Sequence, residues 1–154
     1  MHTADNHKTV QKSVGSHQMG KWVVISAWLP VLMYMAAIHF LSSLRALPDL
    51  PESFISWDKA QHFLAYTGLG LLACRASRLR PLLSQVRTNL QAFGIVVLYG
   101  VVDEIHQIYV PGRSADVDDW IADAAGALFA VIIIVAVRKI LTKGGEYLDR
   151  SARR

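Results

Sequence analysis

Long apolar runs separated by short polar segments dominate the chain. The clearest run covers residues 22–44, where twenty-three residues include no Asp, Glu, Lys or Arg. At about 1.5 Å per residue, a helix of this length can cross a hydrocarbon core of about 30 Å. The run is also too long for the apolar part of a signal peptide, which favours a retained anchor. Residues 120–137 form a second strong run, interrupted only by Asp123.

Two weaker runs complete the pattern. Residues 90–102 are uncharged and reach spanning length when the more polar residues 103–109 are added. Residues 57–76 hold a short apolar stretch behind charged residues, so this segment alone also fits an interfacial or core helix. Arginines follow this segment directly, which favours a membrane crossing. A short span can be accommodated by packing inside a bundle. We therefore predict an all-α fold, an integral membrane bundle of four transmembrane helices.

The distribution of charge predicts how these helices are oriented. Of the 154 residues, 53% are hydrophobic and only 18% are charged, with a formal net charge of +4. With a cytoplasmic N-terminus, thirteen of the sixteen Lys and Arg fall inside and nine of the twelve Asp and Glu fall outside. Cytoplasmic loops of membrane proteins are enriched in Lys and Arg. We therefore predict that both termini are cytoplasmic, with residues 1–20 and 141–154 as polar tails of a membrane domain over residues 21–140.

This charge pattern also narrows the classes of partner. The basic excess is a topology signal, and the arginines lack the interleaved aromatic residues that binding of single-stranded nucleic acid needs. We therefore expect the lipid bilayer as a partner and no nucleic acid. The single cysteine, Cys74, excludes a disulfide framework and a cysteine-based zinc module.

Three of the predicted helices carry a polar stripe at the same, outer end. Spacings of three or four residues place the members of each stripe on one helix face. The stripes are Asp58, His62 and Tyr66; Asp103 and Gln107; and Asp116, Asp119 and Asp123. A carboxylate near the bilayer centre costs about 2.5–3.5 kcal/mol, so these groups should turn inward. We predict a polar pocket that opens to the outside.

Lys59 and Arg113 are the cations available to this pocket. Asp103 and Glu104 lie at the C-terminal end of their helix, where the helix dipole disfavours a carboxylate, so we expect Lys59 or Arg113 to hold them. Asp119 also needs a cation, because it lies one turn from Asp123. An ion-pair network that only fixes helix register remains an alternative to a ligand site.

Several polar and small residues also fit purely local roles. Asp58 fits the start of its helix, with Ser56 as N-cap, and Asp116 fits a cap of the last helix. Pro111 and Gly112 predict a turn. His39 has no partner at a useful spacing. Close helix contacts are predicted at Gly68, Gly70 and Gly126.

Two motifs identify a family resemblance. They are Asp58-Lys59-x-x-His62-Phe63-x-x-Tyr66 and Asp103-Glu104-x-x-Gln107-x-x-x-Pro111-Gly112-Arg113-Ser114-x-Asp116-x-x-Asp119, followed by Gly126. Together they closely resemble the VanZ-like family of bacterial membrane proteins. The resemblance implies a small multi-pass protein of the cytoplasmic (inner) membrane, in a family named for reduced susceptibility to teicoplanin, without a settled activity. Many members carry Asn in place of Asp123 and glycine in place of Ala130.

Three classes of function remain open. In the first, the pocket binds a lipid-linked or polar cell-envelope component at the outer face, and Arg113 suits bidentate recognition of phosphate or carboxylate. In the second, the acids and His62 hold a divalent metal for hydrolysis or transfer on a lipid phosphate, although no complete motif such as H-E-x-x-H is present. The third is transport or a proton relay, which the apolar inner halves of the helices disfavour. The candidate pocket residues are Asp58, Lys59, His62, Tyr66, Asp103, Glu104, Gln107, Arg113, Asp116, Asp119 and Asp123.

Overall fold

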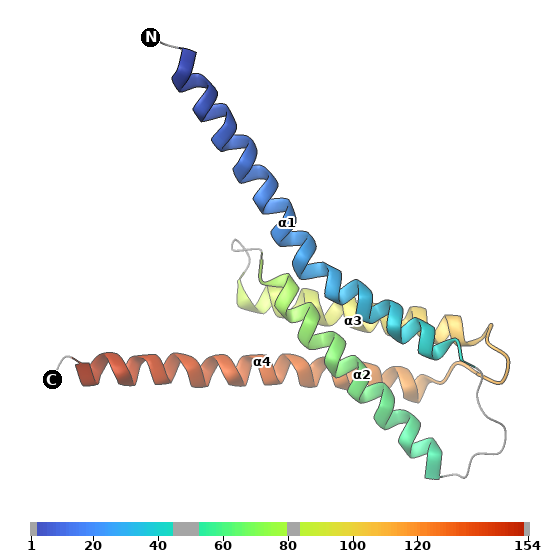
Figure 1. Cartoon of the computed structure of the whole chain (residues 1–154). Coiled ribbons are helices and arrows are strands. Elements are labelled where there is room, and N and C mark those ends of the chain that lie inside the picture. The colour runs from blue at the N-terminus through green and yellow to red at the C-terminus, as the bar shows by residue number, and fades with distance from the viewer. Residues whose placement is uncertain (1–2, 45–52, 80–83, 153–154) are drawn as a thin grey trace.

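The structure is a computed structural model that describes residues 3–44, 53–79 and 84–152. These ranges contain four helices and no strand, which confirms the predicted all-α fold (Figure 1). The helices are α1 (Thr3–Ser42), α2 (Ser53–Ser77), α3 (Gln85–Gln107) and α4 (Val117–Ala152). Some charges used to predict the orientation lie outside the described residues, namely Arg45, Asp49, Glu52, Arg80, Arg153 and Arg154.

Two helices extend beyond the predicted spans. The backbone of α1 is already helical at Thr3, and α4 continues to Ala152, so helix runs through most of both predicted tails. The two ends project away from the other helices (Figure 1). Polar residues can continue a helix beyond its apolar part, because most of them have only a small cost in helix propensity. The sequence pattern therefore identified the apolar parts of these helices rather than their full length.

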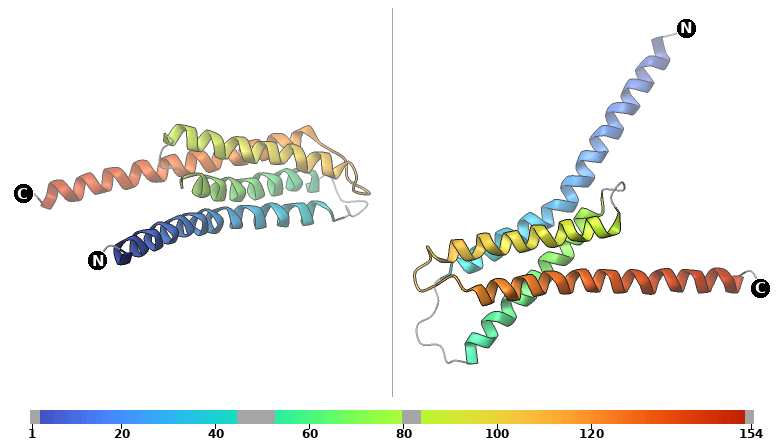
Figure 2. Two further views of the ribbon diagram at one scale, coloured as in Figure 1. Left: turned by 90° about the horizontal axis from the view of Figure 1, so that it is seen from above. Right: turned by 180° about the vertical axis from the view of Figure 1, so that it is seen from behind.

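Helix α2 lies at the centre of the bundle. It packs against α1, α3 and α4, and the view from above shows it between α1 and the other two helices (Figure 2). Its inward face is almost fully buried. The buried side chains of α2 include Tyr66, Leu69, Ala73 and Cys74. Different faces of α2 therefore contact each of the other three helices.

Local signals explain where α3 and α4 begin. Ser84 precedes α3 and its hydroxyl accepts a hydrogen bond from the Arg87 backbone N–H, as expected of an N-cap. The connection between α3 and α4 turns at Gly112, whose φ is 82°. The turn is closed by a 3.0 Å bond from the Arg113 N–H to the Val110 carbonyl. This confirms the turn predicted at Pro111 and Gly112, because only glycine adopts such a φ without strain.

Glycines allow α2 and α4 to approach each other closely, as predicted. A Cβ at Gly126 would overlap the backbone carbonyl oxygen of Phe63. A Cβ at Gly70 would lie 2.7 Å from the Cβ of Ala130, which is itself fully buried. The backbones of α2 and α4 therefore meet without intervening side chains.

Within the described ranges, two helical segments are long and apolar enough to cross a membrane. They are Gly20–Ser42, with a mean hydropathy of 1.9, and Val117–Gly144, with a mean hydropathy of 2.4. Helices α2 and α3 do not meet the same criterion, yet they also expose large apolar side chains such as Leu64, Leu90 and Leu98. Exposed apolar surface of this extent is typical of proteins that contact lipid. A topology of four spans with both termini inside stays a prediction.

The close packing of α2 on α4 predicts the effect of a single added methyl group. The substitution Gly126→Ala should lower the free energy of unfolding by about 1–3 kcal/mol, because overpacking displaces backbone rather than a flexible side chain. Thermal unfolding of the detergent-purified protein measures this change.

Gly144→Ala is the matched control on the same helix, because no atom lies within 4 Å of a Cβ built there. The control should be neutral or slightly stabilising, since Ala favours helix more than Gly does. Equal stability of the two variants would contradict the close contact.

Candidate functional site

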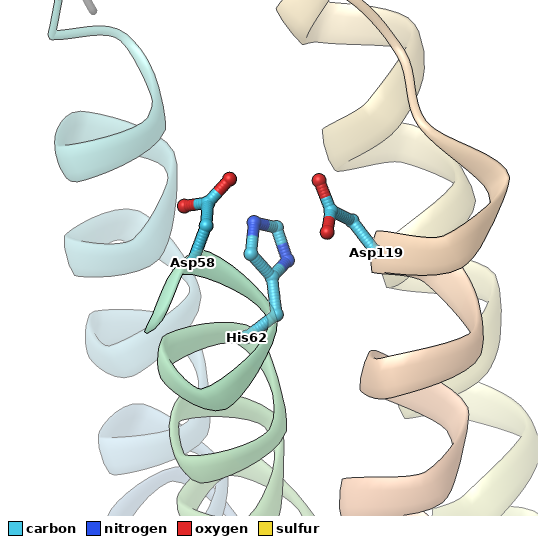
Figure 3. Close-up of side chains that lie close together, drawn as sticks. All are labelled: Asp58, His62 and Asp119. Atoms are coloured by element: carbon cyan, nitrogen blue, oxygen red, sulfur yellow. The ribbon is translucent and has the colours of Figure 1, made fainter. Parts of the chain in front are cut away.

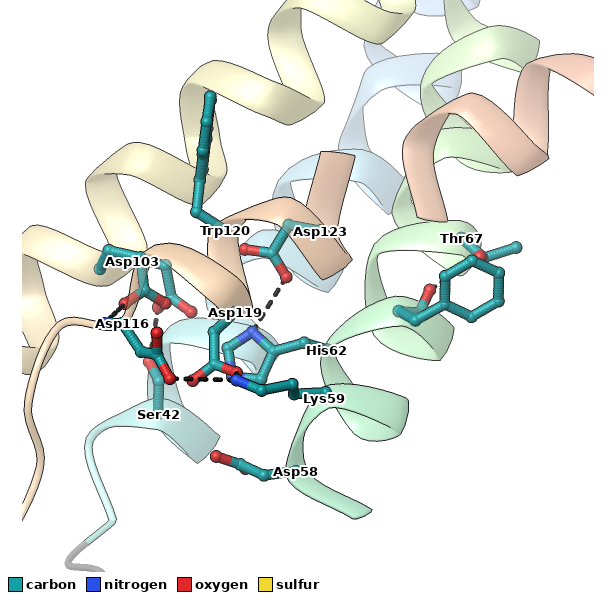
Figure 4. Close-up of polar contacts among 12 residues, drawn as sticks. Ser42, Asp58, Lys59, His62, Thr67, Asp103, Asp116, Asp119, Trp120 and Asp123 are labelled. Atoms are coloured by element: carbon teal, nitrogen blue, oxygen red, sulfur yellow. Dashed lines mark hydrogen bonds and ion pairs between the residues drawn. The ribbon is translucent and has the colours of Figure 1, made fainter. Parts of the chain in front are cut away.

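Eleven polar residues gather at the end of the bundle where α1 ends and α3 connects to α4. Figure 4 labels Asp58, Lys59, His62, Asp103, Asp116, Asp119 and Asp123 among them. We call the whole group the polar cluster. Its members are Asp58, Lys59, His62, Tyr66, Asp103, Glu104, Gln107, Arg113, Asp116, Asp119 and Asp123. Every one of them is joined to another member by a hydrogen bond or an ion pair, or lines a common cavity with other members. The structure therefore brings the residues of the three stripes close to Lys59, Glu104 and Arg113; that they form a functional site stays a prediction.

Lys59 binds the first turn of α4. Its Nζ lies 3.0 Å from Asp116 Oδ2 and 3.1 Å from Asp119 Oδ1, and 3.9 Å from Asp118 Oδ2. The Asp119 side chain is only 8% exposed, so Lys59 compensates a nearly buried charge. A charged partner of this kind stabilises a carboxylate that water no longer reaches. The prediction that a cation holds Asp119 agrees with this geometry.

Asp116 caps α4, as its position predicted. Its Oδ1 accepts a 2.8 Å bond from the Asp118 backbone N–H, and its backbone carbonyl accepts from the Asp119 N–H. These bonds satisfy donors that the first turn of a helix leaves unpaired. The hydrogen bond from the Asp118 N–H, together with the ammonium of Lys59, holds the pKa of the Asp116 carboxyl below its usual range.

Asp58 does not have the predicted capping role. Helix α2 begins at Ser53, so both Ser56 and Asp58 lie within the helix rather than at its start. The Oδ1 of Asp58 instead lies 3.9 Å from the guanidinium of Arg113. The prediction placed the start of α2 too late, because the charged residues at its entrance interrupt the apolar pattern.

His62 and Asp123 form the deepest pair of the polar cluster. The Nδ1 of His62 lies 2.9 Å from Asp123 Oδ1, and the Asp123 side chain is completely buried (Figure 4). Asp119, one turn earlier on α4, is bound by Lys59 instead. Two different side chains of α2 thus contact the two neighbouring acids of α4, the ammonium of Lys59 at Asp119 and the imidazole of His62 at Asp123, which limits the repulsion expected between the acids.

Asp103 is held by a residue that the sequence did not single out. Its Oδ1 accepts a 2.7 Å hydrogen bond from the hydroxyl of Ser42, at the end of α1. Neither Lys59 nor Arg113 holds it, so that prediction is wrong. The available signal was the pair of serines near the C-terminal end of the apolar run 22–44, because a polar residue there can face the pocket from α1.

Glu104 is also held without a cation. Its Oε2 accepts a 2.7 Å bond from the backbone N–H of Asp116. The expected partners are engaged elsewhere: Lys59 binds α4, and Arg113 faces Asp58 and the Leu44 carbonyl, which is 3.5 Å from its Nε. A backbone donor from the connection to α4 is invisible in a pattern of side chains, which explains the error.

His39 has a partner that sequence spacing did not suggest. Its ring centroid lies 4.0 Å from that of His106, and the Nε2 of His106 lies 2.9 Å from the hydroxyl of Ser43. These contacts join the ends of α1 and α3 next to the polar cluster. The prediction that His39 lacks a partner is therefore wrong, because residues far apart in the chain meet through helix packing.

A cavity of about 340 Å³ opens beside the polar cluster. One wall is apolar and comes largely from the end of α1, whereas the other wall is polar. The apolar lining includes Ile38, Leu41, Leu44 and Ala65; the polar lining comprises Ser42, Asp58, Gln61, His62, Tyr66, Asp103, Gln107 and Arg113. The Tyr66 hydroxyl and the Gln107 amide nitrogen are buried and have no hydrogen-bond partner among the described residues. Buried donors of this kind usually have one.

Two carboxylate oxygens of the cluster are likewise buried without a partner within the described ranges, Glu104 Oε1 and Asp123 Oδ2. Two sets of three residues place their ligand atoms within 4.8 Å of one another. One set is Asp58, His62 and Asp119 (Figure 3), and the other is His62, Glu104 and Asp123. The second set is the more deeply buried, so the unpaired oxygens and the possible metal ligands coincide there.

The family model described as VanZ/LLP1 matches residues 6–138, which include the whole polar cluster. The chain belongs to the VanZ-like family. No curated protein and no solved structure matches the chain. Membership of the VanZ-like family agrees with the two helices that are apolar enough to span a membrane, and it supports a membrane protein of this family.

The departures from the VanZ-like pattern can now be placed in the structure. Asp123, where many members are expected to carry Asn, is the buried partner of His62. Ala130, where a glycine is expected, faces Gly70. The close contact of α2 and α4 is therefore retained because glycine stands on the opposite helix.

The ion pairs of Lys59 predict a measurable stability difference. Lys59→Met removes the cation and leaves the nearly buried Asp119 uncompensated, which should lower the free energy of unfolding by about 1–3 kcal/mol. The double variant Lys59→Met with Asp119→Asn should recover part of that loss, because the unpaired charge is then absent.

Asp118→Asn is the control, because Asp118 is exposed and 3.9 Å from Lys59. Its stability should stay within about 0.5 kcal/mol of the unmodified chain. Strictly additive effects in the double variant would contradict a direct interaction between Lys59 and Asp119.

Proposed function

We propose that this VanZ-like protein binds the phosphate or carboxylate head of a lipid-linked cell-envelope component at the outer face of the bacterial cytoplasmic membrane. The observation that carries the proposal is the composition of the cavity wall. Tyr66 and Gln107 line the same cavity as Arg113, and the Tyr66 hydroxyl and Gln107 amide nitrogen are buried without a partner in the described part of the chain. A ligand with several acceptor oxygens would satisfy all three groups.

Arg113, rather than Lys59, is the cation available to such a ligand. Lys59 is bound by two carboxylates at 3.0 and 3.1 Å, and it does not line the cavity. The contacts of Arg113 are longer: 3.9 Å to Asp58 and 3.5 Å to the Leu44 carbonyl. A planar guanidinium with weak partners retains donors for bidentate recognition of phosphate or carboxylate.

The apolar wall favours an amphiphilic ligand over a free ion. Ile38, Leu41 and Leu44 line the cavity from the α1 side, next to the polar residues. An acyl or prenyl chain can pack on this wall while its head reaches Arg113, since burial of apolar surface contributes about 25 cal/mol per Å². The same arrangement supports the VanZ-type role in susceptibility to teicoplanin, a drug that acts on the cell envelope, as part of the proposal.

Transport is the less favoured function. The polar side chains gather at one end, and the inner parts of α2 and α4 are apolar over residues 68–74 and 128–137. A pathway through a membrane normally needs polar groups along its length. Binding at one face requires only the end that carries the polar cluster.

The ligand proposal predicts the effect of changing Arg113. In nanodiscs containing a polyprenyl phosphate, Arg113→Ala should weaken binding by about tenfold or more, because a charge-assisted hydrogen bond contributes about 1.5–3 kcal/mol. Arg113→Lys should bind at an intermediate level, since it keeps the charge but loses the bidentate fork. Teicoplanin susceptibility of cells expressing each variant at equal levels should follow the same order.

Arg87→Ala is the matched control, because Arg87 is exposed near the start of α3, whereas the polar cluster lies at the C-terminal end of that helix. It should bind as the unmodified chain does. Equal binding by the Arg113 variants and the control would remove the main support for the proposal.

The proposed orientation has its own test. In a Cys74→Ala background, a cysteine at Ser114 should react with a membrane-impermeant thiol reagent added to spheroplasts, whereas a cysteine at Lys143 should not. Both positions are exposed in the structure. Labelling only at position 143 would place the polar cluster on the cytoplasmic side and contradict the orientation.

A further inference from the structure

We propose that His62, Glu104 and Asp123 bind a divalent metal ion between α2, α3 and α4. The ligand atoms of these residues lie within 4.8 Å of one another. Each comes from a different helix, so an ion there would join the three helices at the end that carries the cavity. This site does not depend on the envelope ligand proposed above, although His62 belongs to both.

The first support is the charge balance of the buried carboxylates. Four acids of the polar cluster are at most 7% exposed, and one of them, Asp119, is paired with Lys59. The other three are Asp103, Glu104 and Asp123. Lys59 is bound by α4 and Arg113 lies beside Asp58, so neither of these cations pairs with any of the three acids. As a metal ligand the imidazole of His62 is neutral. Uncompensated buried charge is strongly unfavourable, and a divalent cation supplies the missing positive charge.

The second support is the set of oxygen atoms without partners. Glu104 uses Oε2 to accept from Asp116, and Asp123 uses Oδ1 to contact His62. The second oxygen of each carboxylate, Glu104 Oε1 and Asp123 Oδ2, is buried without a partner in the described part of the chain. Ionised carboxylates only accept, so a cation or a donor is what these oxygens lack.

The neighbouring set of Asp58, His62 and Asp119 fits a cation less well (Figure 3). The ammonium of Lys59 lies 3.1 Å from Asp119 and would repel a metal at that carboxylate. Asp58 is 43% exposed and lies on the side of Arg113. The deeper set lacks both of these competing cations as direct partners, so the metal is assigned there.

The ligand types indicate which metals bind. Imidazole suits zinc and other transition metals, whereas carboxylates also accept Mg²⁺, Ca²⁺ and Mn²⁺. One His with two carboxylates therefore favours Zn²⁺ or Mn²⁺ over Mg²⁺ and Ca²⁺. Three protein ligands also leave a coordination position open, as in zinc sites that take water or substrate as a further ligand.

The test is metal binding by the full-length protein in detergent. The protein carries no polyhistidine tag, and its N-terminal His2, His7 and His17 are replaced by Gln so that they cannot bind metal. After chelator treatment and dialysis, Zn²⁺ and Mn²⁺ are each added, and bound metal is measured by mass spectrometry. We expect about one equivalent per chain and a raised thermal-unfolding midpoint with either metal, as linkage requires. No binding of either metal at micromolar concentration overturns the proposal.

Variants locate the bound ion. Glu104→Gln and Asp123→Asn keep the size of the side chain and should each reduce metal affinity by at least about tenfold, because even indirect partners of a metal site change affinity by that amount. Asp118→Asn, an exposed acid of the same end, should bind like the parent chain. Equal loss in all three, or unchanged binding in the first two, overturns the assignment.

If Asp123→Asn fails to fold, the variant Glu104→Gln still tests the metal site. Glu104→Gln retains an oxygen that can accept the hydrogen bond from the Asp116 N–H, so its effect on metal binding is measured in a folded protein. Binding of the metal alone is also measured without any lipid. Failure of metal binding thus leaves the envelope-ligand proposal standing, and the reverse holds equally.

Discussion

Compensation of buried carboxylates is the constraint on which this end of the molecule depends. Asp116 caps α4, and the first turns of α4 carry Asp119 and Asp123. Helix α2 contacts these acids through the ammonium of Lys59 and the imidazole of His62. Without these pairs, closely spaced negative charges would face an interior from which water is largely excluded. The positions of α2 and α4 relative to each other are therefore fixed by charge as well as by apolar packing.

Close backbone packing makes this compensation possible. Gly126 lets α4 approach the backbone of α2 at Phe63. Phe63 is next to His62 on α2, and Gly126 lies one turn after Asp123 on α4. A longer distance between the helices would separate the Nδ1 of His62 from the Asp123 carboxylate, which now lie 2.9 Å apart. The cavity beside these pairs is lined by Tyr66 and Gln107, whose buried donors have no partner among the described residues, and by an apolar wall from α1. One helix thus organises both the ion pairs and the proposed ligand site.

The sequence predicted the parts of this arrangement that periodicity encodes. Apolar runs indicated four helices, and the spacing of Asp58, His62 and Tyr66 indicated one inward face. Individual partners were less predictable, because they depend on how helices distant in the chain meet. The bond from Ser42 to Asp103, and the backbone donor that holds Glu104, arise only in the packed bundle. To predict these two contacts, one would have to know how far α1, α3 and α4 are shifted along their axes relative to one another.

The pairing of His62 with Asp123 is the central contact of this account, and solid-state NMR measures it directly. The protein is labelled with ¹⁵N in histidine and ¹³C in aspartate and placed in lipid bilayers. A strong dipolar coupling between the His62 Nδ1 and the Asp123 carboxyl carbon is expected, since the Nδ1 and Oδ1 atoms lie 2.9 Å apart. Asp123→Asn identifies the signal by its loss. A spectrum in which His62 shows no such coupling would contradict the account.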